Sequence, residues 1–275
     1  MGALRDWAAW LDDWAVPPAI LASVDESPWV LPREVFSRRA DRQIAEPTGP
    51  THFEAVAALA RPGTVLDVGS GAGATSLALI GRASVTAITA VDNDDELLAA
   101  FAERAGRLGV AARPVHGWWP DVAVDIEPAD VAVCGHVLYN IRDLAPFVAA
   151  LTANARRRVV VELTERHPLT TLNPLWERFH GISRPTRPTA DDAVAALAEA
   201  GFHPLVTRWS RPAESDYGDF AELVETTRRR LCLPAAAAPE VEVALREVGH
   251  DPAVPPDLGS SGRQLMTLTW DGTAT

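Results

Sequence analysis

A turn rich in glycine follows an apolar segment early in the chain. Residues 64–68 read as a strand, and Gly69, Gly71 and Gly73 come directly after it. Glycine lets the backbone approach a ligand closely, and backbone N–H groups at such a strand-to-helix turn can donate to that ligand. The next apolar segment ends at Asp92, where a carboxylate can accept hydrogen bonds from ribose hydroxyls. Loop and acid together predict a site for an adenosine-type nucleotide, and a purely structural turn is the alternative.

The acid before the glycines narrows the choice of nucleotide. The glycine spacing, with Ala74 after it, also fits the fingerprint of dinucleotide-binding domains. Asp67, however, would place a carboxylate beside the turn, where it repels a pyrophosphate and suits a cationic amino-acid group. A long helical stretch before the loop is also unusual for a dinucleotide domain. The sequence therefore favours a nucleoside that carries a cationic amino-acid part.

Polar side chains follow two later strand-like segments. His136, Tyr139 and Asn140 come after residues 130–134, and a cluster from Glu162 to His167 comes at the end of residues 159–163. Ligands of open α/β sheets bind outside the carboxyl ends of the strands, so these side chains are candidates for catalysis. His136 is the leading general base, because an imidazole can take a proton from a hydroxyl or acid near neutral pH. The alternative is that His136 only caps the strand or touches the cofactor.

The cluster after the second of these segments gives two further candidates. Glu165 and His167 are predicted to act on the acceptor, while Arg166 is more simply read as half of a surface ion pair. His52 and His180 are weaker candidates, since each fits a packed or surface histidine. The arginine triplets 156–158 and 228–230 are read as helix ends that favour the helix dipole, and neither is assigned to the site.

The surrounding chain alternates between strand and helix patterns. The predicted strands are residues 64–68, 85–91, 112–116, 130–134, 159–163, 202–209 and 264–270, with helices over 74–80, 95–108, 144–155 and 190–200. This alternation indicates an α/β fold with a doubly wound, mainly parallel, seven-stranded sheet whose last strand is antiparallel. Residues 1–50 are expected to form an N-terminal helical lid on a main domain of residues 51–275. Residues 165–188 are expected as a loop and residues 212–257 as a helical insertion, both on the substrate side.

With these motifs the chain resembles the class I, Rossmann-like S-adenosylmethionine-dependent methyltransferases. The resemblance covers residues 50–164 and the last strand. It implies that Asp67, Gly69, Gly71 and Gly73, with Ser70 between them, lie along the methionine end of S-adenosylmethionine. Residues 173–176 and 178–181 further resemble an actinobacterial branch of the family, which indicates no substrate.

The resemblance also implies roles for the residues that follow the second, third and fourth strands. Asp92 and Asn93 would hold the ribose, and the segment from His116 through Gly117, Trp118 and Trp119 would contact adenine. The acid usual at that loop is missing unless Asp121 serves, and a packed tryptophan pair is as good an interpretation as adenine stacking. The segment with His136 would lie over the reactive methyl, which leaves S-adenosylhomocysteine after transfer.

Composition excludes several other kinds of function. The 275 residues carry a net charge of −12 and contain no lysine, which disfavours nucleic acid as a substrate and rules out a lysine base or Schiff base. Cys134 and Cys232 have no spacing typical of a metal site. No apolar run is long enough to span a membrane, and the first residues lack the pattern of a signal peptide, so we expect a cytoplasmic protein.

The sequence thus predicts a methyltransferase for a small-molecule acceptor, with O- or N-methylation favoured. A nicotinamide-dependent oxidoreductase is the first alternative, although no lysine can complete a Tyr-x-x-x-Lys pair. A regulatory protein that binds S-adenosylmethionine without catalysis is the second, and a nucleic-acid methyltransferase the third. The helical insertion could also serve as the contact of a homodimer.

Overall fold

The computed structural model describes residues 2–29, 31–212, 216–250 and 264–274. They form one seven-stranded sheet in the order β3-β2-β1-β4-β5-β7-β6, in which β7 runs antiparallel to both of its neighbours. The predicted α/β sheet with an antiparallel last strand is confirmed. The strands are β1 (Gly63–Val68), β2 (Val85–Asp92), β3 (Ala111–His116), β4 (Ala129–Gly135), β5 (Ala155–Thr164), β6 (Leu205–Ser210) and β7 (Gln264–Asp271).

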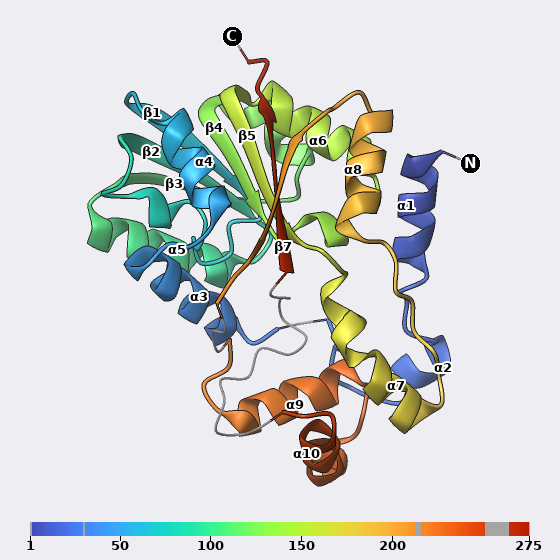
Figure 1. Ribbon diagram of the computed structural model, residues 1–275. Coiled ribbons are helices and arrows are strands. Elements are labelled where there is room, and N and C mark those ends of the chain that lie inside the picture. The colour runs from blue at the N-terminus through green and yellow to red at the C-terminus, as the bar shows by residue number, and fades with distance from the viewer. Residues whose placement is uncertain (1, 30, 213–215, 251–263, 275) are drawn as a thin grey trace.

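Helices cover both faces of this sheet and the edge at which its parallel strands end (Figure 1). One face carries α3 (Arg33–Ala45), α4 (Pro50–Ala58) and α5 (Asp95–Leu108), and the other carries α1 (Ala3–Asp12), α6 (Leu144–Ala153) and α8 (Ala190–Glu199). Beyond the edge lie α2 (Pro18–Leu21), α7 (Asn173–His180), α9 (Phe220–Arg230) and α10 (Ala238–Glu247). We call these last four helices the cap.

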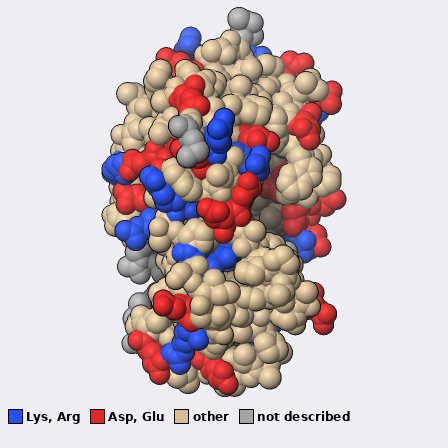
Figure 2. All heavy atoms as spheres, turned by 90° about the vertical axis from the view of Figure 1, so that its right-hand side faces the viewer, with Lys and Arg blue, Asp and Glu red and all other residues tan. Residues whose placement is uncertain are grey.

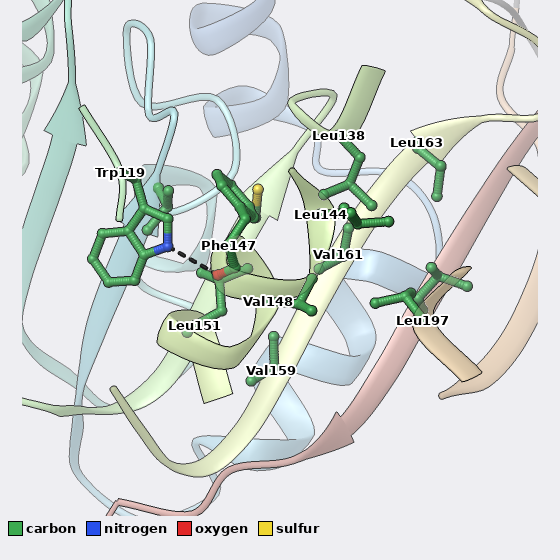
Figure 3. Close-up of a cluster of buried hydrophobic side chains, with 14 of the residues drawn as sticks. Trp119, Leu138, Leu144, Phe147, Val148, Leu151, Val159, Val161, Leu163 and Leu197 are labelled. Carbon is green, nitrogen blue, oxygen red and sulfur yellow. Dashed lines mark hydrogen bonds between the residues drawn. The ribbon is translucent and has the colours of Figure 1, made fainter. Parts of the chain in front are cut away.

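Burial follows the position of each strand in the sheet. The central strands β1 and β4 bury nearly every residue, because helices cover both of their faces. The edge strands β3 and β6 are mostly exposed. On the face of α6, Phe147, Val148 and Leu151 pack against Val159 and Val161 of β5, as Figure 3 shows. This packing fixes the carboxyl ends of the central strands, where the predicted site lies.

The helix predicted over residues 74–80 is wrong. The chain there makes a run of turns with only a short 3-10 helix at Leu77–Leu79. Ser76 donates its hydroxyl hydrogen bond to Asp67 at 2.5 Å, inward from the glycine turn. Serine and threonine side chains that bond elsewhere compete with helix formation, which accounts for the difference.

The ends of α6 and β5 also differ from expectation. The helix stops at Ala153, where the side chain of Asn154 donates to the carbonyl of Ala150, and the arginines of residues 156–158 begin β5. Arg157 pairs with Asp130 at 3.0 Å and Arg158 with Asp271 at 3.0 Å. The triplet therefore lies within β5, with two of its arginines paired with acids, and does not end a helix.

The cap has a hydrophobic core of its own. Val16 of the N-terminal segment, Leu175 of α7, Leu223 of α9 and Val241 of α10 belong to one buried cluster. Residues 165–188, expected as a loop, therefore contain a helix because Leu175 and its neighbour Trp176 fill this core. In Figure 2 the cap forms the smaller body below a waist in the molecule. The predicted domain boundaries stay a prediction, and residues 251–257 of the insertion lie outside the described residues.

A buried ionic cluster ties α3 to the segment before α9. Asp216 is fully buried and accepts hydrogen bonds from Arg39 at 3.0 and 2.8 Å and from Arg42 at 2.8 Å. Arg211 approaches the same carboxylate at 3.6 Å. Buried charges need such partners, so this cluster fixes the position of α3 over the glycine turn.

Candidate active site

The glycine turn adopts a backbone that only glycine takes without strain. Gly69, Gly71 and Gly73 have φ angles of 70°, 51° and 92°. A Cβ atom at Gly69 would come within 2.3 Å of a methyl group of Val137, the residue after His136. The turn and the segment after β4 therefore approach each other so closely that no side chain fits between them.

Asp92 joins the predicted site segments. Its Oδ2 accepts the N–H of Gly71 at 2.8 Å, its Oδ1 accepts the N–H of Asp94 at 3.1 Å, and its carbonyl accepts the N–H of Gly117 at 3.0 Å. The N–H of Gly69 donates to the carbonyl of Val91. Several N–H groups of the turn, which the sequence predicts to be donors to a ligand, are therefore bonded within the protein. Each carboxylate oxygen of Asp92 keeps a further lone pair, which could accept a hydroxyl.

Asp67 lies inward from the turn and is 1% exposed. Burial raises its pKa to about 7, against the opposing effect of the hydrogen bond from Ser76. Its Oδ1 is buried and has no hydrogen-bond partner within the described part of the chain. The carboxyl is thus neutral in part near pH 7, and a cation bound nearby would favour its charged form.

We expect Asp67→Asn to raise the stability of the ligand-free protein more at high pH than at low pH. The pKa of Asp67 is higher in the folded than in the unfolded state, so its contribution to stability is full below pH 4 and is lost as the pH rises through about 7. The wild type should lose up to roughly 1.4 kcal/mol per pH unit in that window relative to the variant. Thermal unfolding of both proteins between pH 4 and 8 measures this, and parallel curves would contradict it.

The buried polar atoms around the turn fit a bound nucleoside. Among the described residues, Oδ1 of Asp67, Oγ of Ser70 and Nε2 of His52 are buried without a hydrogen-bond partner. Two of these atoms, on Asp67 and Ser70, belong to β1 and the glycine turn, whereas His52 lies on α4. Buried polar groups are normally satisfied, so the two atoms at the turn fit a polar ligand. Asp67, Ser70 and the lone pairs of Asp92 fit the amino-acid and ribose parts of S-adenosylmethionine.

The tryptophan pair after β3 is divided between core and surface. Trp119 is buried, and its indole N–H donates to the carbonyl of Phe147 at 3.1 Å (Figure 3). Trp118 is 68% exposed and Asn93 is exposed beside β2. The packing interpretation accounts for Trp119, which leaves Trp118 as the tryptophan available to a base. Their roles toward the cofactor, with that of Gly117, stay predictions.

His136 and Glu162 form a pair at the ends of β4 and β5. Nε2 of His136 lies 3.0 Å from Oε1 of Glu162, and the backbone N–H of His136 donates to the carbonyl of Glu162 at 2.8 Å. His136 has a φ of 60°, a backbone rare for residues with a side chain and often associated with function. Burial alone would raise the pKa of Glu162, but hydrogen bonds from His136 and Thr51 hold it below its ordinary value.

The sequence named Glu162 only as one member of a polar cluster. Its pairing with His136 follows from the parallel register, which sets Gly135 opposite Glu162. The feature of the sequence that could have singled out Glu162 is that it is the one acid in the apolar segment 159–163.

The other predicted catalytic residues lie in packed surroundings. His167 stacks on Trp14 with ring centroids 4.0 Å apart, and its Nδ1 accepts the N–H of Leu169 at 3.3 Å. Burial lowers the pKa of His167 to about 3, so its ring is neutral. The Tyr139 hydroxyl donates to the carbonyl of Thr164 at 2.8 Å, and burial raises its pKa.

Glu165 is held differently, at the surface, by an ion pair with Arg208 at 3.0 Å. In the described part of the chain, no hydrogen bond, ion pair or ring contact joins Tyr139, Glu165 or His167 to His136. Their catalytic roles therefore stay predictions, and packing or pairing accounts for each side chain. Within the described ranges, no group of three His, Cys, Asp or Glu side chains could hold a metal, and no helix is long and apolar enough to cross a membrane.

The chain is similar to known proteins in part of its sequence and in its fold. Residues 65–158 match a family model described as a methyltransferase domain, a segment that contains the glycine turn, Asp92 and His136. No curated protein sequence matches the chain significantly.

Solved methyltransferase structures share the fold. Magnesium protoporphyrin IX methyltransferase from Synechocystis PCC 6803, solved with S-adenosylhomocysteine, is 13% identical with a TM-score of 0.51, covering 98% of each chain. A methyltransferase from Geobacter sulfurreducens, also solved with S-adenosylhomocysteine, is 21% identical with a TM-score of 0.50, covering 87% of this chain and 97% of the other. At these identities the likeness shows the fold alone. Together with the family match it indicates S-adenosylmethionine as the cofactor. Residues 65–158 of this chain thus match the model of a methyltransferase domain, and the chain has the Rossmann-like methyltransferase fold.

Proposed function

We propose that the protein transfers a methyl group from S-adenosylmethionine to an oxygen or nitrogen atom of a small molecule. The observation that carries the proposal is the convergence of the glycine turn, Asp92 and the His136–Glu162 pair at one edge of the sheet. We also propose that the protein works in the cytoplasm and belongs to the actinobacterial branch that its sequence resembles. A homodimer is part of the same proposal.

S-adenosylmethionine supplies an electrophilic methyl group on a sulfonium. The chain's own residues have to align the acceptor with that methyl, exclude water and remove a proton where the acceptor must lose one. The Nε2–H of His136 donates to Glu162, which fixes the ring and leaves Nδ1 as the atom that can accept this proton. Glu162 carries the negative charge that stabilises the imidazolium, as the acid of a catalytic triad does.

The position of the cap favours a small molecule as the methyl acceptor. The cap lies beyond the carboxyl edge of the parallel strands and has its own buried core, so the site faces the cap (Figure 1). A polynucleotide would need an open and positively charged face, whereas the chain carries a net charge of −12.

Calorimetric titration tests the proposal directly. S-adenosylmethionine and S-adenosylhomocysteine should bind the purified chain with micromolar affinity, while NADH and NADPH should not. Nicotinamide binding alone would replace the methyltransferase with an oxidoreductase. Cofactor binding without label transfer to any acceptor, using tritiated methyl groups, would favour the regulatory alternative.

A further inference from the structure

Arg230, the last residue of α9, lacks a hydrogen-bond or ion-pair partner among the described residues. Its neighbour Arg228 donates to Glu26, Glu225 and the carbonyl of Leu233. Arg230, by contrast, has no hydrogen bond or ion pair to any residue of 2–29, 31–212, 216–250 or 264–274, and its Nε is buried. The Arg230 side chain is partly exposed, but its Nε is buried without an acceptor among the described residues, so an anionic ligand at this point would be stabilised.

Arg230 lines a small aromatic cavity in the cap. Trp14, Trp29 and Trp176 form its walls together with Arg184. The guanidinium of Arg184 lies over the ring of Trp176 at 4.9 Å and donates to the carbonyl of Ala15 at 3.0 Å. The other described lining residues are apolar, and none of the described residues that line the cavity is acidic. Its described lining is therefore apolar with two arginines and no carboxylate.

The cavity adjoins a larger groove. Trp14 and Trp29 line both, and the groove, of about 480 Å³, continues along Tyr139 and Asn140, which follow His136 in the chain. Sites for small molecules usually have roughly 300–1,000 Å³. The groove can hold the body of such a molecule, whereas the cavity, of about 10 Å³, has the space of about one water molecule, so a charged group would meet Arg230 at its mouth.

His167, which stacks on Trp14, does not add a positive charge to the cavity. Burial lowers the pKa of His167 to about 3, and the charges of Arg230 and Arg184 act in the same direction. Burial also lowers the pKa of Arg230, yet a guanidinium keeps its proton in proteins. Arg230 is thus a charged side chain that lines the cavity, while the nearby ring of His167 is neutral.

We propose that Arg230 binds the carboxylate of the methyl acceptor, whose apolar or aromatic body lies along Trp14 and Trp29. A planar guanidinium matches a planar carboxylate in a two-point hydrogen bond, and indole rings bind an apolar body. The assignment of this ligand as the acceptor rests on the proposed methyl transfer. The expected acceptor class is a small apolar carboxylic acid with a hydroxyl or amine to be methylated.

Binding of simple probes tests the charge requirement. Phenylacetate, titrated against the complex with S-adenosylhomocysteine and followed by tryptophan fluorescence, should bind more tightly than its neutral analogue phenylacetamide. Arg230→Gln should weaken phenylacetate roughly 10-fold to 100-fold and leave phenylacetamide unchanged. Arg230→Lys should restore part of the difference, because it keeps the charge but not the planar fork.

The matched control is Arg246→Gln, which removes an exposed arginine of α10 paired with Glu242. It should leave both affinities unchanged. Equal binding of acid and amide, an Arg230→Gln protein that binds phenylacetate like the wild type, or tighter binding of phenyl phosphate would each overturn the assignment. Circular dichroism of the variants separates loss of binding from loss of folding.

The two proposals can fail separately. If S-adenosylhomocysteine binds the wild type and Arg230→Gln equally while phenylacetate shows no dependence on Arg230, only the acceptor assignment fails. If phenylacetate binding to the protein without cofactor depends on Arg230 while no sulfur nucleoside binds, the carboxylate site stands and the methyl transfer fails.

Discussion

Asp92→Ala should remove measurable binding of S-adenosylmethionine, lowering its affinity by roughly 100-fold or more through the loss of two charge-assisted hydrogen bonds. The same carboxylate also accepts the N–H groups of Gly71 and Asp94. Its removal therefore disorders the turn as well as the ribose contact. Asp92→Asn, which keeps one acceptor oxygen, should have an intermediate affinity. Calorimetric titration of the three proteins measures the series.

The control for this series is Asp95→Ala, because Asp95 has the same side chain three residues away and its side chain is 79% exposed. It should bind the cofactor like the wild type. Micromolar binding by Asp92→Ala would mean that the ribose is held elsewhere and would refute the assignment of the second strand end.

His136→Asn should lower the rate of methyl transfer by roughly 100-fold or more while changing cofactor affinity little, since general bases contribute about 10²–10⁴-fold. Asparagine is the suitable replacement because His136 has a φ of 60°, a backbone that asparagine tolerates better than most residues. The measurement is the initial rate of tritiated methyl transfer to the fastest acceptor in a panel of hydroxylated aromatic carboxylates, at saturating cofactor.

Glu162→Gln provides the comparison, since Glu162 acts through His136 and positions it. It should lower the rate less than His136→Asn, because the ring keeps a hydrogen-bond acceptor while the imidazolium loses its carboxylate. If His136→Asn transfers methyl groups within threefold of the wild type, or loses cofactor binding to the same extent as activity, His136 is a cofactor contact and not a base.

The regular part of the fold could be predicted because apolar strands and amphipathic helices leave a periodic trace. The predicted helix of residues 95–108 coincides with α5, and Asp92 ends β2 as expected. Residues 74–80 were mispredicted because their apolar pattern is helical, whereas the decisive contact is the hydrogen bond from Ser76 to Asp67. A contact between two elements leaves no mark on local periodicity.

The arginine triplet of α9 shows the same limit at the site. Arg228 and Arg230 look equivalent in sequence, and both were read as part of a helix end. Only the folded cap distinguishes them, since Arg228 faces Glu26 and Glu225 while Arg230 faces the cavity with Trp176. Likewise His167 is identified as a packed ring only by its stacking on Trp14.

The position of β7 has a consequence for the synthesis of the chain on the ribosome. β7 lies between β5 and β6 in the sheet, but residues 211–263 separate β6 from β7 in the chain. At roughly 5–20 residues per second, this interval takes about 3–10 s. During that time β6 has no strand to pair with, and the apolar Val159, Val160 and Val161 of β5 form an open edge of the nascent sheet. Open edges invite pairing with other chains, so each newly made copy needs protection from aggregation for those seconds.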